Sequence, residues 1–206
     1  IVTIEKQDQP GIEISMSGIK YESIPVDPEN NTAGKAILSL LDTVESKQGF
    51  KVHIEKGIPP GSGIGSSSAS AAAAVVGVNE LLNKPLENSE LLVHGMAGEA
   101  VASGGFHADN IAPALFGGII LIRSYEPLDI LNLPVPKKLF STAVLPDFIV
   151  NTLDARRMLP KRVPLKSAVE QAGNLAGFTL GLHESDFDLL GRSMVDLFAE
   201  PFRAEL

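Results

Sequence analysis

The segment Ile58–Ala74 reads I-P-P-G-S-G-I-G-S-S-S-A-S-A-A-A-A. Prolines stiffen its start, Gly61, Gly63 and Gly65 free the backbone at alternate positions, and an alanine-rich run then favours a helix. Glycines let successive N–H groups face one point. The unpaired N–H groups at the start of the helix carry the positive end of its dipole in the same direction. The pattern therefore predicts a phosphate-binding loop that leads into a helix.

Other motifs of similar composition fit this segment less well. The Walker A loop ends in Gly-Lys-Ser/Thr and the dinucleotide fingerprint is G-x-G-x-x-G, whereas the spacing here is G-x-G-x-G without a lysine. A nucleophile elbow is absent because Pro60 occupies the place of its first glycine. A flexible linker is disfavoured because the run continues into the apolar residues 71–82. A nucleotide bound here would depend on backbone N–H groups and a metal.

The composition indicates a globular protein. Of its 206 residues, 44% are hydrophobic and 20% are charged, which is enough for a sizeable core. The absence of cysteine excludes disulfides and thiolate metal sites, and it favours a reducing compartment, so we expect a cytoplasmic protein. A net charge of −8 argues against nucleic acid and anionic membrane as partners. The longest apolar runs fall far short of the roughly 18 residues of a membrane span.

The apolar periodicity predicts alternating strands and helices. Residues 1–6 and 11–16 are expected to form an antiparallel pair, and a helix over 32–46 to begin with Thr32 as its N-cap. A strand over 50–55, with His53 on its polar side, leads to the glycine loop. Further helices are expected over 67–83, 89–103, 165–182 and 186–198, and strands over 116–122 and 138–145. Prolines between 127 and 136 mark the expected domain boundary.

Two polar features interrupt the apolar pattern. Glu99 lies among small apolar residues near the end of its helix, where burial and the helix dipole both oppose its charge, so it needs a cation partner. Gly95 and Gly98 precede it and predict the close approach of another helix. Residues 103–110, S-G-G-F-H-A-D-N, are either an Asx-rich turn that satisfies His107 locally or part of a site.

These residues resemble the GHMP small-molecule kinases, whose second motif is P-x-x-x-G-[LI]-G-S-S-[AS]. The matching residues are Pro59, Pro60, Gly61, Ser62, Gly63, Ile64, Gly65, Ser66, Ser67 and Ser68. Within that superfamily, residues 97–118 resemble the homoserine kinases, with the pattern A-G-E-A-x-A-S-G-x-x-H-A-D-N-I-A-P-A-L-x-G-G. T-x-x-x-R with L-P after it, over 152–160, and E-P-F-R, over 200–203, strengthen the resemblance.

The resemblance implies an α+β GHMP kinase fold with two domains. Residues 1–134 would form the N-terminal α/β domain with the glycine-rich phosphate loop, and 135–206 a truncated C-terminal ferredoxin-like domain. The implied reaction is the ATP-dependent phosphorylation of the L-homoserine side-chain hydroxyl, a step of threonine biosynthesis, with ATP and Mg²⁺ as cofactors. A homodimer is a further expectation. The family's first and third motifs are absent before Ile1 and after Leu206, so we expect an incomplete chain.

The resemblance also implies roles for individual residues. The loop Pro59–Ser68 would hold the phosphates, and Ser67 and Glu99 would hold Mg²⁺, which gives Glu99 its cation. Asn110 stands where mevalonate kinases carry a catalytic aspartate, so it would orient the substrate hydroxyl without acting as a base.

The carboxylate of the substrate would be clamped by Arg156 and Arg203, a task that suits the guanidinium group. Thr152 and His107 would be neighbouring substrate contacts. Another GHMP kinase, acting on mevalonate or a sugar, is the nearest alternative, and Asn110 and the arginine pair argue against it. A non-catalytic nucleotide-binding module also stays open because of the absent motifs.

Overall fold

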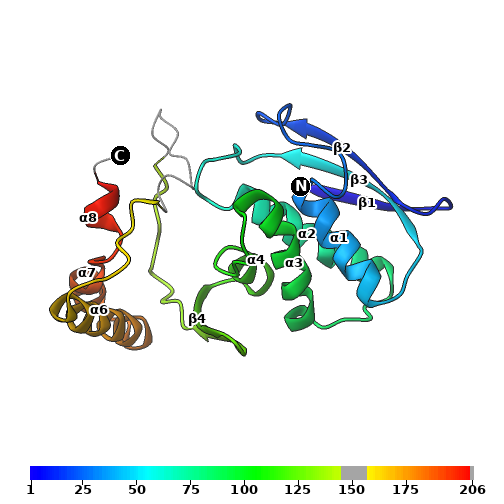
Figure 1. The fold of residues 1–206 in the computed structure, drawn as a ribbon. Coiled ribbons are helices and arrows are strands. Elements are labelled where there is room, and N and C mark those ends of the chain that lie inside the picture. Colours follow the sequence, from blue (N-terminus) through cyan, green and yellow to red (C-terminus); the bar gives the residue numbers. More distant parts are fainter. Residues whose placement is uncertain (145–156, 205–206) are drawn as a thin grey trace. The chain divides into compact units, whose positions relative to one another are not determined.

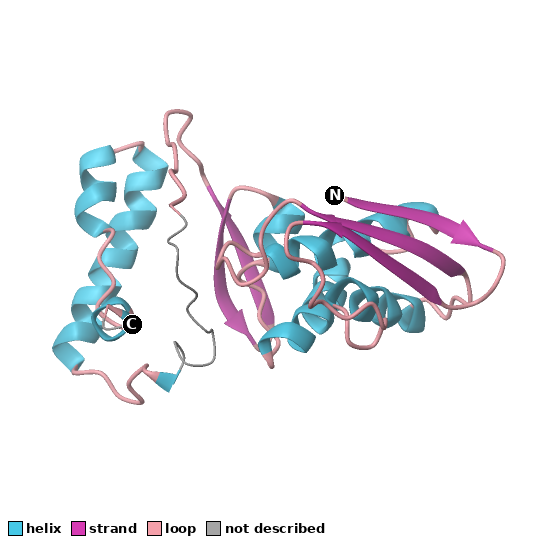
Figure 2. Cartoon of the chain, turned by 90° about the horizontal axis from the view of Figure 1, so that it is seen from above, coloured by secondary structure: helices cyan, strands magenta, loops and turns pink. Residues whose placement is uncertain are grey.

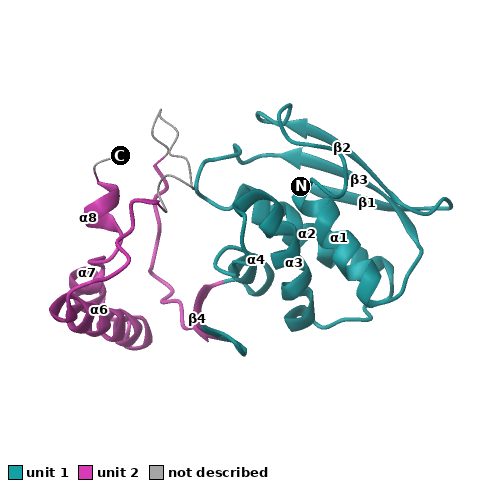
Figure 3. Ribbon diagram, in the orientation of Figure 1, with its two compact units in different colours: residues 1–117, 124–130 teal, residues 118–123, 131–206 magenta. Residues whose placement is uncertain are grey.

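The computed structural model describes residues 1–144 and 157–204, which fall into two compact units. The first unit contains residues 1–117 and 124–130, and the second contains residues 118–123 and 131–206 (Figure 3). The phosphate loop predicted from the sequence lies in the first unit. The predicted domain boundary at residue 134 stays a prediction.

The sheet of the first unit has the strand order β1-β3-β2, with β1 at Val2–Gln7, β2 at Ile12–Gly18 and β3 at Gly49–Lys56 (Figure 1). β3 runs antiparallel to β1 and parallel to β2, so the predicted antiparallel pair of the first two strands was wrong. The reason lies in the connection, because the chain passes from β2 through a helix to β3, and such a unit makes its two strands parallel neighbours. The alternate residues Phe50, Val52 and Ile54 of the central strand are buried.

Four helices accompany this sheet, and the first three gather on one of its faces (Figures 1 and 2). They are α1 (Thr32–Thr43), α2 (Ser66–Leu81), α3 (Asn88–Ser103) and α4 (Ile111–Phe116). The N-cap of α1 is Asn31 and not Thr32 as predicted, because the Asn31 side-chain oxygen accepts hydrogen bonds from the N–H groups of Ala33 (3.0 Å) and Gly34 (3.2 Å).

Helix α3 approaches its neighbours closely at its two glycines. A Cβ on Gly98 would lie 2.8 Å from the Cβ of Ala36 and would also meet the carbonyl oxygen of Thr32, both in α1. A Cβ on Gly95 would lie 2.6 Å from Cγ2 of Ile111 in α4. The predicted close approach at both glycines is therefore confirmed.

A two-stranded sheet of β4 (Ile119–Tyr125) and β5 (Leu128–Leu133) follows. β4 begins later than predicted because Phe116 ends α4 and Gly117 and Gly118 have positive φ, at 73° and 68°. The predicted strand over 138–145 was wrong for its described residues, 138–144, which form no strand. Its apolar side chains are exposed there, Phe140 by 87% and Val144 by 83%.

The described residues of the second unit include the helices α6 (Leu165–Glu184), α7 (Phe187–Ser193) and α8 (Glu200–Arg203). α6 packs on α7 at Gly181, where a Cβ would lie 2.9 Å from Cγ of Leu190. The helix predicted over 186–198 is shorter in the structure. It ends at Ser193 and is followed by a turn whose N–H groups bind the Asp196 side chain. Among the described residues, no helix combines the length and the apolar character needed to cross a membrane.

Candidate active site

The glycine loop joins the end of β3 to the start of α2. Gly61, Gly63 and Gly65 have φ values of 74°, 77° and 76°, which side chains with a Cβ rarely adopt. The space beside Gly61 and Gly63 is open, since a Cβ there would meet nothing within 4 Å. The N-cap of α2 is Gly65, so this 16-residue helix has no side-chain cap. Its first N–H groups are therefore available to an anion.

Ser62 carries a second sign of an anion site in this loop. Its Oγ is buried, and it has no hydrogen-bond partner among the residues that the structure describes. Buried hydroxyls normally have a partner, and one without it in a native structure requires an explanation. A phosphate oxygen held by the loop would accept this hydrogen bond, so the residues present fit the phosphates of a nucleotide.

A buried carboxylate lies beside the first turn of α2. Glu99 is 9% exposed, and its Oε2 accepts a hydrogen bond of 2.8 Å from Oγ of Ser68. The half-buried Ser67, which the family resemblance favours as metal ligand, is one residue earlier. The described residues contain no group of three or more His, Cys, Asp or Glu side chains suited to a metal. One carboxylate with a hydroxyl still fits Mg²⁺, which takes few protein ligands when phosphates supply others.

Sequence reasoning missed Lys56, the last residue of β3. Its side chain is buried, and its Nζ donates hydrogen bonds to Oγ of Ser70 (2.7 Å) and to the carbonyl oxygen of Ser66 (3.0 Å). Burial lowers the pKa of Lys56, against the opposing negative charge of Glu99. A signal was present in the sequence, since position 56 continues the inward-facing alternation of Phe50, Val52 and Ile54.

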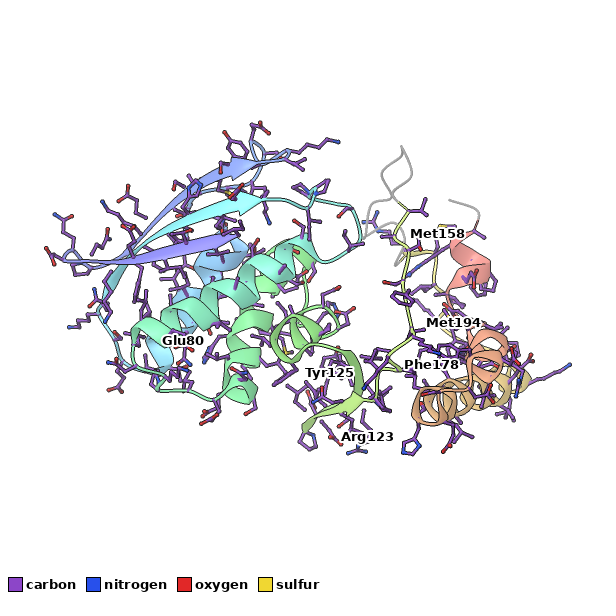
Figure 4. All side chains as sticks on the ribbon, turned by 180° about the vertical axis from the view of Figure 1, so that it is seen from behind. Glu80, Arg123, Tyr125, Met158, Phe178 and Met194 are labelled. Carbon is purple, nitrogen blue, oxygen red and sulfur yellow. The ribbon has the colours of Figure 1, made fainter. Side chains whose placement is uncertain are left out.

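The polar segment before α4 reaches the glycine loop. Oδ1 of Asn110 lies 3.1 Å from the position that a Cβ on Gly65 would occupy. His107 is half-buried, and its ring lies against Gly105, whose Cβ would be 2.8 Å from Nε2. The hydroxyl of Tyr125 (labelled in Figure 4) accepts a hydrogen bond of 3.3 Å from the N–H of Ala108. The structure thus brings Asn110 to the loop, while His107 turns back on its own segment.

The remaining predicted site residues belong to the second unit. Arg203 is exposed in α8, and the turn before that helix is held by Asp196. The Asp196 carboxylate accepts hydrogen bonds from the N–H groups of Phe198 (2.7 Å) and Ala199 (3.0 Å). These bonds lower the pKa of Asp196, and the positive charge of Arg203 adds to the effect. Thr152 and Arg156 lie outside the described residues.

Known proteins are similar to this chain in sequence. The model of the GHMP kinases N terminal domain matches residues 31–118. A homoserine kinase of Methanococcus vannielii is 46% identical over 207 residues, which cover 100% of this chain and 68% of that protein. The chain belongs to the homoserine kinase family of the GHMP kinases. A homoserine kinase of Chlorobium phaeobacteroides is 43% identical, again over the whole chain and over 67% of the relative.

Solved structures agree with this family membership. The crystal structure of homoserine kinase from Cytophaga hutchinsonii matches with a TM-score of 0.95 and 43% sequence identity. The match covers 100% of this chain and 65% of the Cytophaga chain. L. major mevalonate kinase, solved in complex with R-mevalonate, shares the fold with a TM-score of 0.64 at 19% identity. The predicted α+β GHMP kinase fold is confirmed. The chain spans about two thirds of the length of the homoserine kinases that it matches.

Proposed function

We propose that this chain phosphorylates L-homoserine on its side-chain hydroxyl, with ATP as the phosphoryl donor, to give O-phospho-L-homoserine for threonine biosynthesis. The relatives named homoserine kinase, at 41–46% identity, support this reaction. The observation that carries the proposal is the position of Asn110, whose side chain lies against Gly65 at the end of the glycine loop. An acceptor-binding residue at this place would hold a hydroxyl next to a bound phosphate.

The nucleotide phosphates would lie over the loop Pro59–Ser68. Backbone N–H groups at the start of α2 and the hydroxyl of Ser62 would donate hydrogen bonds to them. Glu99, together with Ser67 or Ser68, would hold Mg²⁺, which when bound neutralises charge on the β- and γ-phosphates. Glu99 is the only buried carboxylate among the residues that the structure describes, which agrees with a cation that takes its other ligands from phosphate and water.

Asn110 would orient the acceptor and take no proton, because a carboxamide is not a base at neutral pH. The hydroxyl oxygen would form a bond to the γ-phosphorus while the bond from that phosphorus to the ADP oxygen breaks, and the hydroxyl proton would pass to an oxygen of the transferred phosphate. In a loose transition state little proton abstraction is needed early, so placement of the hydroxyl and stabilisation of charge lower most of the barrier. Orientation alone supplies up to ~7–11 kcal/mol in favourable cases.

The substrate carboxylate would be bound by Arg203 and Arg156, with Thr152 and His107 as neighbouring contacts. A guanidinium group forms two parallel hydrogen bonds to a carboxylate, which a sugar substrate does not offer. The cysteine-free composition supports a cytoplasmic location, and the net charge of −8 disfavours nucleic acid and anionic membranes as partners. A homodimer stays a prediction.

The test is a coupled assay of ADP release by the full-length gene product, with L-homoserine, mevalonate and galactose as separate acceptors. We expect turnover with homoserine alone. Turnover with mevalonate or galactose in place of homoserine would assign the chain to another GHMP activity. ATP binding without turnover of any of the three would indicate a nucleotide-binding module and would overturn the proposal.

A further inference from the structure

Lys56 is a buried cation at the base of the glycine loop. Its Nζ donates hydrogen bonds of 2.7 Å to Oγ of Ser70, 3.0 Å to the carbonyl oxygen of Ser66 and 3.3 Å to Oγ of Ser66. Lys56 is the last residue of β3, and Ser66 is the first residue of α2, so the glycines of the loop lie between them. The three bonds therefore hold the two ends of the loop together and reach one turn further into α2.

The serine side chains that bind Lys56 also have other hydrogen-bond partners. Oγ of Ser66 donates to the carbonyl oxygen of Ile58 at 2.8 Å, and Oγ of Ser70 donates to the carbonyl oxygen of Ser66 at 3.1 Å. A methionine at position 56 would leave each of these groups with a partner and would avoid the cost of burying an ammonium group. A fold that needed only packing at this position would favour the apolar side chain.

We propose that Lys56 is a positioning residue of the phosphate loop, whose ammonium group ties the end of β3 to the first turn of α2 and keeps the N–H groups of that turn directed at the nucleotide. The inference rests on the proposed function only in taking ATP as the ligand of the loop. The geometry gives the lysine two effects. It holds the two ends of the loop together, and it adds a positive charge near the N-terminus of α2, which already attracts anions.

The test compares Lys56→Met with Lys51→Met in the full-length gene product. Lys51 lies in the same strand with an exposed side chain, so it is a matched control. MgATP binding is measured by calorimetric titration without homoserine, and thermal unfolding is measured in parallel. We expect Lys56→Met to bind MgATP about tenfold more weakly, the scale of one charge-assisted hydrogen bond, without a fall in Tm. Lys51→Met should bind within about twofold of the unsubstituted protein.

Steady-state kinetics separate positioning from general damage. Lys56→Met should raise the KM for ATP and leave the KM for homoserine within about twofold, because the lysine acts through α2 alone. Equal MgATP affinity of the two lysine variants would overturn the inference. So would a fall in Tm of Lys56→Met with unchanged MgATP affinity, since that pattern marks a merely structural lysine.

Ser70→Ala keeps the inference testable if Lys56→Met does not fold. It removes the acceptor of the 2.7 Å bond, and the main-chain acceptor of Lys56 remains. We expect weaker MgATP binding by about threefold or more, and an unchanged affinity would contradict the inference. Measurements on the unsubstituted protein separate the proposed kinase reaction from the proposed role of Lys56. If that protein binds MgATP but does not turn over homoserine, the proposed reaction is overturned, and the MgATP affinities of the lysine variants can still be compared.

Discussion

Asn110 Oδ1 lies 3.1 Å from the place that a Cβ on Gly65 would fill. The two residues are far apart in the sequence, and the absence of a side chain at Gly65 is what lets the carboxamide reach the end of the glycine loop. Gly65 also has a φ of 76° and caps α2 with no side chain of its own. The same residue therefore serves the helix N-terminus and makes room for the proposed acceptor-binding group.

Asn110→Ala should lower kcat for homoserine by more than tenfold, equivalent to about 1.4 kcal/mol, because the hydroxyl loses the group that orients it. Steady-state ADP release measures the effect. Asn132→Ala, an exposed asparagine of β5, is the control and should retain full activity. A loss below tenfold in Asn110→Ala would leave its proposed role without support.

Glu99→Gln should reduce kcat by about a hundredfold or more, because even the mutation of a residue that only hydrogen-bonds to a metal ligand typically costs about 10–100-fold in metal affinity or activity. The amide can still accept the hydrogen bond of Ser68, so the protein should fold. The measurement is ADP release over a range of Mg²⁺ concentrations, with circular dichroism to check the fold. Activity close to that of the unsubstituted protein would contradict the proposed role of Glu99 in binding Mg²⁺.

Ser67→Ala and Ser68→Ala form a matched pair that separates the two candidate hydroxyl ligands. The variant that raises the Mg²⁺ concentration for half-maximal activity identifies the ligand. Ser68 is the serine hydrogen-bonded to Glu99, whereas the family resemblance favours Ser67. If both variants had the Mg²⁺ dependence of the unsubstituted protein, neither hydroxyl would be a ligand of the cation.

His94 should make the fold less stable in mild acid. Burial lowers the pKa of His94, against the opposing charge of Glu90, and its Nδ1 lies 2.9 Å from Oγ of Ser39. As the pH falls, His94 therefore takes up its proton in the unfolded chain before it does so in the folded protein. The free energy of unfolding is highest above about pH 6.5 and decreases as the pH drops below that value.

His94→Gln, which keeps a polar partner for Ser39, should flatten this pH dependence in urea unfolding at pH 7 and pH 5. His183→Gln changes an exposed histidine of α6 and should retain the slope of the unsubstituted protein. An equal slope in His94→Gln and the unsubstituted protein would contradict the assignment.

Asp196→Ala should weaken homoserine binding. The carboxylate accepts hydrogen bonds from the N–H groups of Phe198, Ala199 and Glu200, and so it orders the turn that presents Arg203. We expect a several-fold higher KM for homoserine and an unchanged KM for ATP. Asp188→Ala in α7 is the control. A rise in both KM values would indicate general disruption in place of a local effect on Arg203.

The glycine loop and its helix could be predicted because their signals are local. Alternate glycines specify positive φ, and the alanine run specifies the helix. The strand order could not be predicted from alternation, since pairing depends on the path through α1. The hydroxyl beside Glu99 was equally inaccessible, because successive helical residues point about 100° apart and the rotation of α2 decides which serine faces α3. Lys56 was predictable in principle, from the alternation of β3.

Gly98 determines where Glu99 points. Its missing side chain lets α3 touch the backbone of α1 at Thr32, and any rotation of α3 would bring a neighbouring, larger residue into that contact. The absence of a Cβ at Gly98 therefore helps to set the direction of the Glu99 carboxylate. An alanine at position 98 would clash with the carbonyl oxygen of Thr32, so α3 would have to shift away from α1 and would move the Glu99 carboxylate with it. Such a variant would disturb the candidate site without changing any of its proposed residues.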